Sequence, residues 1–493
     1  MTGGFLATAL AAACRRLGPV LALSAGALLL FALPLQAAEE AGVPHFEVAE
    51  LGLVWGIPFV GILLSIAVLP LIAPVFWHHN FGRVSLFWAL LVLVPFAIVF
   101  GFGVTLYEVL HIALLEYLPF IILLFSLFTV AGGVRLKGAL RGSPAVNTAM
   151  LLLGTILASW MGTTGAAMLL IRPMLRANAW RQYKTHVFVF FIFLVANVGG
   201  SLTPLGDPPL FLGFLKGVEF FWPTEHLLTP MLVVAVPLLV IFFAFDSFMF
   251  AREESKQAPA PDPDAGPQEA LGLEGGVNLL LLVGVVAAVL MSGVWVPEVE
   301  ITVYHVHVEL QNLARDLLLL AIAGLSLWLT QHESRKANSF SWFPIVEVAK
   351  LFAGIFITIF PVIAMLRAGE AGALGGIVTA VSDQGQPDNL MYFWITGLLS
   401  SFLDNAPTYL VFFNTAGGDA QHLMGPLQNT LLAISCGAVF MGANTYIGNA
   451  PNFMVRSICE DQGVRMPSFF GYMVWSGLFL MPLFVVVTLL FFS

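Results

Sequence analysis

Charged residues are scarce in this chain. Asp, Glu, Lys and Arg make up 10% of its 493 residues, whereas a soluble domain carries about 25%. The few basic residues form no patch of the kind that binds nucleic acid. The three cysteines show neither paired nor metal-ligand spacing, so we expect no disulfide framework. The P-loop, HExxH and GxSxG motifs are also missing, which argues against an ATP-driven pump and a membrane-embedded enzyme. We therefore expect neither enzyme activity nor an organic cofactor.

Apolar residues are abundant instead. They make up 59% of the chain, including 43 Phe, and they gather in runs of about 20 residues, the length that crosses a bilayer. A single soluble core would not need so many separate runs. The sequence therefore predicts an all-α polytopic membrane protein with lipid around it. The candidate helices cover residues 51–76, 84–105, 109–133, 187–205, 228–250, 277–296, 316–329, 343–366, 427–447 and 469–492.

Two segments lie outside these helices. Residues 1–38 combine Arg15 and Arg16 with an apolar stretch and Ala37-Ala38, which is typical either of a signal peptide or of a first membrane helix. Residues 251–276 are rich in Pro, Ala and acidic side chains and predict a flexible cytoplasmic linker. We expect a multi-pass protein of the bacterial inner (cytoplasmic) membrane.

An internal duplication relates the two halves. At a fixed offset of 242 residues, seven identical residues coincide in one ungapped alignment, and the string GSLTPLGDPPLF falls on GANTYIGNAPNF. Chance would give two such matches but not seven. We assign repeat 1 to residues 51–250 and repeat 2 to residues 277–493, with five spanning helices in each.

Each repeat contains a further apolar run that is broken in its middle. Residues 144–171 turn at Gly162–Gly165, and residues 391–413 turn near Asp404. Lys and Arg flank the first run on both sides, so both its ends are expected in the cytoplasm, where short loops collect basic residues. Around the second run Arg367 is the one basic residue, which predicts a periplasmic loop set. The pattern favours two inverted five-helix repeats, each with a re-entrant hairpin. The alternative is that each run is one ordinary spanning helix.

A second kind of break lies in the helices that follow the hairpins. Gly and Pro interrupt residues 187–215 at Gly200–Pro209 and residues 427–455 at Gly442–Pro451. Irregular backbone within a membrane is tolerated where it is buried in protein or lines a cavity. The two ends of a broken helix also offer free carbonyl and N–H groups to ions. We therefore predict two related ion or substrate sites near the middle of the membrane.

Two carboxylates, Asp207 and Asp404, fall in these irregular segments. An ionised group inside a membrane costs at least about 2 kcal/mol, which makes it a candidate for function. We predict that one or both bind a cation and exchange it for a proton. The alternative is structural, with Asp207 capping a helix and Asp404 stabilising the hairpin turn. Their repeat partners are Asn449 and Gly162, so the two predicted sites differ chemically.

At these residues the sequence resembles the ion transporter superfamily, which includes NhaD-type sodium/proton antiporters, arsenite permeases, citrate-like carriers and divalent-anion/sodium symporters. The segment Asp404–Thr408 is similar to its DN hairpin motif. The string GGSLTPLGDPPLFLGFLKG is especially similar to a bacterial subgroup labelled both sodium:proton antiporter and citrate transporter. The resemblance covers both repeats, roughly from Val84 to the C-terminus. It implies a homodimer with elevator-type alternating access.

The resemblance also implies which residues bind ions. Antiporters and arsenite permeases carry an acidic turn in the first hairpin too, and carboxylate symporters use Ser-Asn-Thr turns, whereas this chain has Gly162-Thr163. The implied Na⁺ ligands are Asp404, Asn405 and Asp207. The full set of implied cation- or substrate-binding residues is Thr163, Thr164, Ser201, Thr203, Gly206, Asp207, Asp404, Asn405, Thr408, Asn444, Thr445, Gly448 and Asn449.

Three functions are compatible with these patterns. The leading hypothesis is a Na⁺/H⁺ antiporter, with Na⁺ and H⁺ as the coupling ions. The alternative is a symporter that uses Na⁺ or H⁺ to import citrate-like or other organic anions. A membrane-embedded enzyme is the third and weakest hypothesis.

Overall fold

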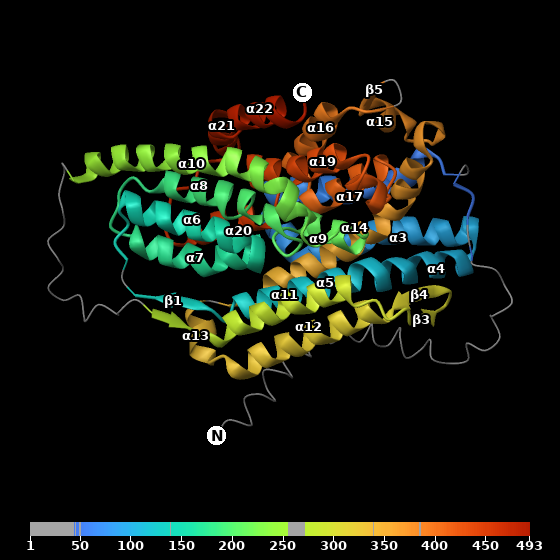
Figure 1. The fold of residues 1–493 in the computed structure, drawn as a ribbon, viewed down its shortest axis with the longest axis horizontal. Coiled ribbons are helices and arrows are strands. Elements are labelled where there is room, and N and C mark those ends of the chain that lie inside the picture. The colour runs from blue at the N-terminus through green and yellow to red at the C-terminus, as the bar shows by residue number, and fades with distance from the viewer. Residues whose placement is uncertain are drawn as a thin grey trace.

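The computed structural model describes residues 44, 46–48, 51–138, 140–254, 272–338, 340–383 and 386–493. Helices dominate this part of the chain (Figure 1). Within it, nine helices are long and apolar enough to cross a membrane, and a bent helix pair raises the number to ten. The predicted all-α polytopic architecture is confirmed. Residues 1–38 and most of the predicted linker, 255–271, lie outside the described residues.

The helices follow one another along the two halves of the chain. The first half contains α2 (Ile57–Ile72), α3 (Pro74–Phe100), α4 (Phe102–Ile112), α5 (Leu118–Ala131), α6 (Pro144–Met161), α7 (Thr163–Ala177), α8 (Thr185–Leu194), α9 (Pro208–Leu215) and α10 (Trp222–Glu254). The second half contains α11 (Val277–Val294), α12 (Leu310–Leu329), α13 (His332–Ala337), α14 (Phe343–Arg367), α15 (Gly375–Ala380), α16 (Asn389–Phe402), α17 (Asn405–Thr415), α18 (Ala420–Met424), α19 (Gln428–Met441), α20 (Ala450–Asp461), α21 (Phe469–Phe479) and α22 (Met481–Phe491).

Short antiparallel strand pairs join some of the loops. They are β1 (Arg135–Lys137) with β2 (Gly272–Glu274), β3 (Glu300–Val303) with β4 (Val306–Glu309), and β5 (Ser382–Asp383) with β6 (Gln386–Pro387). The first pair ties the segment after α5 to the segment before α11, so it connects the two halves of the chain.

The helices α6 and α7 form a helical hairpin. Gly162 separates them with a φ of 80°, a conformation that glycine adopts without steric cost. At the other end, the Gly142 N–H donates to the carbonyl of Ala177 at 2.8 Å, and Asn147 Nδ2 donates to Asn178 Oδ1 at 3.0 Å. The pair therefore starts and finishes at the same end of the molecule. Its second arm is longer than the sequence predicts, because it continues past residue 171 to Ala177.

The helices α16 and α17 form the equivalent pair in the second half. They join at Leu403 and Asp404, and their rings Tyr392 and Phe412 lie 6.2 Å apart across the pair. Asp388 caps α16 by accepting from the N–H of Met391. Both broken apolar runs therefore form helix pairs that turn where the sequence predicts a turn, while the re-entrant placement of these pairs and the inversion of the repeats stay predictions.

Two further helices are broken at equivalent places. After α8 the chain passes through a 3₁₀ turn, Val198–Leu202, before α9 begins at Pro208. After α19 it passes through a 3₁₀ turn, Gly442–Asn444, before α20 begins. Each new helix has Pro in its first turn, where the missing N–H costs nothing and the fixed φ suits a helix. The structure thus contains both breaks that Gly and Pro predict.

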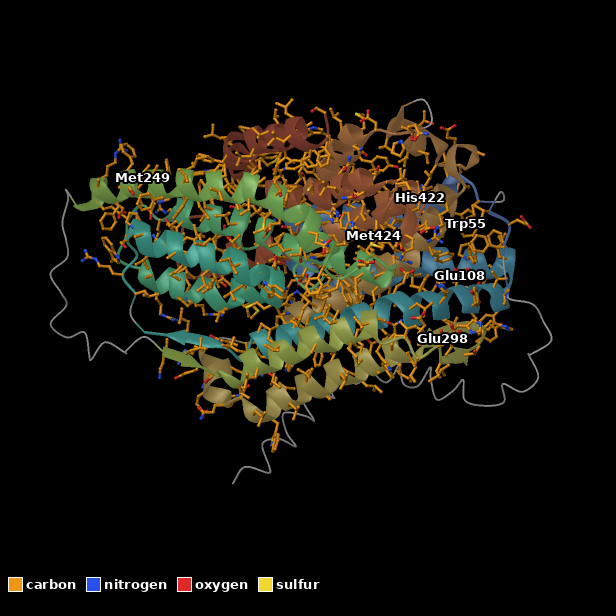
Figure 2. All side chains as sticks on the ribbon, in the orientation of Figure 1. Trp55, Glu108, Met249, Glu298, His422 and Met424 are labelled. Atoms are coloured by element: carbon orange, nitrogen blue, oxygen red, sulfur yellow. The ribbon has the colours of Figure 1, made fainter. Side chains whose placement is uncertain are left out.

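Two hydrophobic cores organise the molecule. One core joins the hairpins to α8, α10 and α19–α22, and the other joins α2–α5, α11, α12 and α14 and includes side chains of α9. In Figure 1 the layer of α5, α11 and α12 lies below the stack of α6, α7 and α8. Trp55, labelled in Figure 2, packs its ring against Phe96 and Phe100 of α3.

Some helix boundaries differ from those that the apolar runs predict. The first predicted helix, 51–76, ends at Ile72, because Pro74 starts α3 in the position at which Pro begins a helix. The last predicted helix, 469–492, is two helices bent by 42°, next to Pro482, since Pro interrupts helical hydrogen bonding. Apolar runs do not locate such boundaries, because hydrophobicity continues through them.

Candidate functional site

Close glycine contacts shape both breaks. A Cβ on Gly206 would lie 2.1 Å from the carbonyl oxygen of Gly200, and a Cβ on Gly448 would lie 2.6 Å from that of Gly442. Both distances are far below van der Waals contact, so only glycine fits where the two chain segments cross. This explains why the spacing of the two glycines is the same in both repeats.

Hydroxyl groups fasten each break to its hairpin. Thr203 Oγ1 donates to the carbonyl of Ser159, and its repeat partner Thr445 donates to the carbonyl of Ser401 at 2.5 Å. These two hydrogen bonds are equivalent at the offset of 242 residues. The hydroxyls of Thr203 and Thr445 therefore position the breaks by bonding to backbone.

The carboxylate of Asp207 lies where both hairpins and both breaks meet. Its Oδ1 accepts from Asn449 Nδ2 at 3.1 Å and from Thr163 Oγ1 at 3.3 Å. Its Oδ2 accepts from Asn405 Nδ2 at 2.5 Å. Thr163 begins α7, Asn405 begins α17, and Asp207 and Asn449 precede α9 and α20. The four residues thus stand at the N-termini of four helices.

This centre joins the two repeats. Thr163 is the repeat partner of Asn405, and Asp207 is the repeat partner of Asn449. The sequence predicts two related sites, whereas the structure brings these four side chains into one hydrogen-bonded group. The reason is that the two breaks face each other, a tertiary contact across 242 residues that local patterns do not contain.

The charge of Asp207 has no ionic partner. The residue is 1% exposed, and its three hydrogen-bond donors are neutral amide and hydroxyl groups. In the part of the chain that the structure describes, no Lys, Arg or His side chain contacts it. Asp207 also occupies the N-cap position of α9 without using its side chain as a cap. The structural alternative for this residue, a helix cap, is therefore not what its side chain does.

Two buried amide oxygens near the breaks are unpaired. Asn405 uses its Nδ2 on Asp207, and Asn444 uses its Nδ2 on Ser401 Oγ at 2.9 Å. Among the described residues, neither Asn405 Oδ1 nor Asn444 Oδ1 has a hydrogen-bond partner. A buried unpaired oxygen is costly unless a ligand satisfies it. Both atoms are hard oxygen donors of the kind that alkali cations prefer.

Asp404 makes the contacts that its structural alternative predicts. It is half-buried, and it caps α17 by accepting from the N–H of Ala406 at 3.1 Å. Thr408 Oγ1 donates to the backbone carbonyl of Asp404 at 2.9 Å. Neither contact excludes an ion, because the second carboxylate oxygen stays uncommitted.

The remaining candidates take backbone or peripheral positions. Ser201 donates to the carbonyl of Val198, and the carbonyl of Gly206 accepts from the N–H of Thr163 at 2.9 Å. Thr164 is half-buried at the start of α7. Gly448 serves the close crossing described above. These residues shape the centre, whereas Thr163, Asp207, Asn405 and Asn449 supply its side chains.

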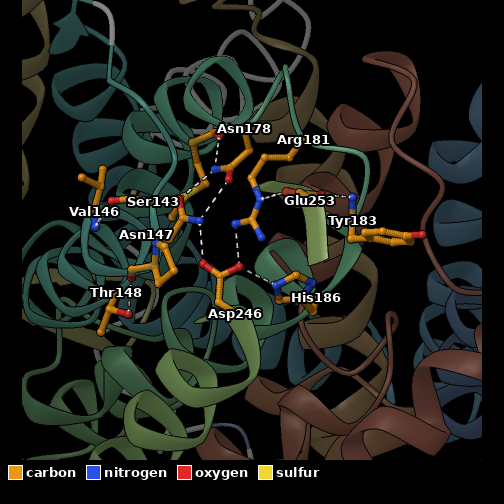
Figure 3. Close-up of polar contacts among 12 residues, drawn as sticks. Ser143, Val146, Asn147, Thr148, Asn178, Arg181, Tyr183, His186, Asp246 and Glu253 are labelled. Atoms are coloured by element: carbon orange, nitrogen blue, oxygen red, sulfur yellow. Dashed lines mark hydrogen bonds and ion pairs between the residues drawn. The ribbon is translucent and has the colours of Figure 1, made fainter. Parts of the chain in front are cut away.

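A second buried carboxylate lies in a different polar cluster (Figure 3). Asp246 of α10 is fully buried. Its Oδ1 contacts Arg181 Nη1 at 2.5 Å and His186 Nε2 at 2.7 Å, and its Oδ2 accepts from Asn147 Nδ2 at 2.9 Å. Arg181 also pairs with Glu253 through Nε at 2.9 Å. This cluster joins α6, α8 and α10.

Sequence reasoning missed that cluster. Asp246 is the only charged residue in the apolar run 228–250, which is the signal that marks an intramembrane ionisable group. Arg181 is one of the Lys and Arg residues that flank the first broken run and that the sequence places in a cytoplasmic loop, yet the structure buries it at 2% exposure. Basic residues near helix ends therefore do not all face water.

The described residues hold no group of three or more His, Cys, Asp or Glu side chains placed to bind a metal ion. The groups that contact Asp207 are two side-chain amides and one hydroxyl, and oxygen atoms of such groups are the ligand type of hard cations rather than of transition metals.

Comparison with known proteins identifies the family. Residues 48–492 match the family model described as "Putative citrate transport". An uncharacterized transporter of Mycobacterium tuberculosis and one of Mycobacterium bovis are each 25% identical over 362 residues, which is 70% of this chain and 78% of theirs. The match covers both hairpins and both breaks, so the chain belongs to this citrate transport family of membrane transporters.

Proposed function

We propose that the protein is a Na⁺/H⁺ antiporter in which Asp207 binds the cation and the proton in turn. The observation that carries this proposal is a fully buried carboxylate whose partners are all neutral. A proton or a small cation stabilises such a group by removing its uncompensated charge. One carboxylate does not bind both at full occupancy, so the two ions exclude each other, and this exclusion couples their movements in opposite directions.

Unpaired oxygens of the second hairpin and of the second break support a site for a dehydrated Na⁺. The unpaired Oδ1 atoms of Asn405 and Asn444 are buried, and Asp404 adds a carboxylate one residue before Asn405. Asp404 therefore stays a second candidate carrier. We further propose that the hairpins and broken helices move together against the core of α2–α5, α11, α12 and α14 in an elevator-type cycle, within a homodimer in a bacterial inner membrane.

Symport of a citrate-like organic anion with Na⁺ or H⁺ is the second candidate function. The family description favours it. It is also favoured by the four helices, α7, α9, α17 and α20, that begin around one centre. Helix N-termini carry partial positive charge, which stabilises anions. In this function Asp207 would bind the coupling cation, and the helix ends and amide groups would bind the carboxylates of the substrate.

Proteoliposomes that enclose a pH-sensitive dye separate the two functions. Na⁺, Li⁺ or K⁺ is added outside, and the internal pH is followed. We expect Na⁺ or Li⁺ alone to drive protons out. No response to cations, together with Na⁺- or H⁺-dependent uptake of labelled citrate, would replace the antiporter by the symporter. If correctly folded protein gives neither signal, both candidate functions are contradicted.

A further inference from the structure

A cavity of about 600 Å³ lies away from the Asp207 centre, between α4, α14 and the end of α9. Phe356, Ile359, Phe360 and Ile363 of α14 supply its apolar wall, and α4 supplies a polar wall. Glu108 on that wall is labelled in Figure 2. We name it the α4–α14 cavity. Its end at Arg367 belongs to the loop set that the sequence predicts to be periplasmic.

Most charged groups of the α4–α14 cavity are paired with protein. Lys216 Nζ and Glu116 Oε1 form an ion pair, in which both side chains are mostly buried. Arg367 is exposed, and its Nε donates to Asn414 Oδ1 at 2.8 Å. These contacts neutralise Glu116 inside the cavity and anchor Arg367 at its edge.

Glu108 differs from these groups. It is half-buried, it lines the cavity, and its carboxylate has no hydrogen bond or ion pair with any described residue. His111 follows three residues later on α4, which places it on the same helix face, and it lines the cavity too. Two lining charges, those of Glu108 and Arg367, have no ionic partner among the described residues. Arg367 is exposed at the edge, whereas Glu108 is the half-buried charge inside the cavity, so a small cation is the ligand that compensates Glu108.

Helix α9 links the floor of the cavity to the Asp207 centre. Lys216 follows directly on α9, a helix of 8 residues whose N-cap is Asp207. Such a helix spans about 12 Å. Glu116, the partner of Lys216, lies in a π-helical turn, Ala113–Tyr117, and π-turns within helices are frequent at functional sites. A movement of α9 against α4 must therefore either break the Lys216–Glu116 pair or move both residues together.

We propose that the α4–α14 cavity is an outer vestibule for small cations, in which Glu108 is the first carboxylate to bind them and the Lys216–Glu116 pair closes the floor. This rests on the proposed cation exchange at Asp207. Glu108 raises the local concentration of H⁺ and Na⁺, since a carboxylate in a low-dielectric cleft focuses the field on incoming cations. It acts on capture of the ion, whereas Asp207 acts on the transport step.

The test compares Glu108→Gln with Glu370→Gln. Glu370 is an exposed residue just after α14 that does not line the cavity, so the control removes the same charge nearby. Na⁺-driven proton efflux is measured in proteoliposomes over a range of external Na⁺ and at two external pH values. We expect Glu108→Gln to raise the half-saturating Na⁺ concentration about fivefold while the maximal rate stays unchanged. Glu108→Asp should retain wild-type behaviour, and Tm in detergent should be equal for all variants.

Each outcome decides something. A Glu108→Gln variant that matches the Glu370→Gln control overturns the vestibule while antiport by the wild type stands. A loss of maximal rate in Glu108→Gln overturns the capture role in favour of a role in the transport step. The proton efflux could instead depend on an added organic anion, with a dependence that changes in Arg367→Gln but not in Glu108→Gln. That result would assign the cavity to an anion and would also overturn the proposal. A wild type that exchanges no cation for protons removes the proposed function, and the vestibule with it.

Discussion

Asp207 and Asp246 are both fully buried aspartates in the same helical bundle, yet their surroundings differ in charge. Asp246 contacts Arg181 and His186, whereas among the described residues Asp207 contacts only amide and hydroxyl groups. The Arg181–Asp246 pair is permanently compensated within the fold. Asp207 has to find its counter-charge in a bound ion or a proton. Burial alone therefore does not mark a transport residue, and the identity of the partners does.

The strongest test of this comparison is Asp207→Asn. The amide has nearly the same shape but carries no charge and binds no proton, so we expect Na⁺-driven proton movement to disappear. The fold should survive, because an uncompensated buried charge is removed, but the single amide oxygen cannot accept all three hydrogen bonds, so we expect a loss of stability of no more than about 1–3 kcal/mol. Transport in proteoliposomes and Tm in detergent measure the two effects. Wild-type transport by this variant would remove Asp207 as the carrier.

Asp404→Asn is the matched comparison for that variant. Asn is as good an N-cap as Asp, so the cap on α17 should remain. We expect reduced but measurable transport, since Asp207 still binds the exchanged ions. Complete loss of transport with an unchanged Tm would instead make Asp404 an equal carrier.

Asp246→Asn should have the opposite profile. The substitution removes one of the two carboxylates that Arg181 pairs with, and breaking a buried ion pair costs up to about 3–5 kcal/mol. We expect a large drop in Tm and in the yield of folded protein, measured by thermal unfolding and by size-exclusion chromatography. Glu253→Gln is the milder control, because it weakens a pair at the edge of the cluster. A Tm equal to that of the wild type would show that this cluster is not a structural support.

The repeat symmetry allows a more discriminating variant. Asp207 and Asn449 are repeat partners in direct contact at 3.1 Å, so Asp207→Asn combined with Asn449→Asp moves the carboxylate to the other repeat. We expect part of the transport that Asp207→Asn loses to return, because the charge stays in the same buried group. The double variant is compared with each single variant in the same vesicles. No recovery by a folded double variant would mean that the position of the carboxylate relative to Thr163 and Asn405 is decisive.

The sequence predicts the breaks well because their causes are local. Glycine at residues 206 and 448 is required because a Cβ there would collide with the carbonyl oxygens of Gly200 and Gly442, and the duplication repeats that requirement at a fixed offset. The same patterns also contain the family resemblance that the comparisons bear out. What they lack is the distance between the two breaks. The contact of Asp207 with Asn449 depends on how two repeats pack, and no spacing within either repeat determines it.

The Asp246 cluster shows how a local sequence signal can leave the role of a residue undetermined. A lone acid in an apolar run was visible in the sequence, but its partners come from three separate segments around Asn147, Arg181 and His186. Without them, a structural carboxylate and a transported-ion carboxylate look alike. Predicting function from an intramembrane acid therefore requires knowing which side chains neutralise it.

The smallest effect is expected where a carboxylate has two basic partners at the surface. Glu274 accepts from Arg135 at 3.0 Å and lies 3.2 Å from Lys137 Nζ, and these contacts, that of Lys137 first, lower the pKa of Glu274 below its usual range. A carboxylate with a lowered pKa stabilises the fold above its ordinary pKa and loses that contribution as the pH falls through the lowered value. Glu274→Gln should therefore reduce Tm slightly at neutral pH, and the difference from the wild type should vanish in acid and shrink in high salt, because exposed ion pairs are screened. A large loss of Tm at neutral pH would show that the β1–β2 pair links the two halves of the chain more strongly than a solvent-exposed ion pair does. The expected difference in stability between the buried pairs of Asp246 and the exposed pairs of Glu274 would then be wrong.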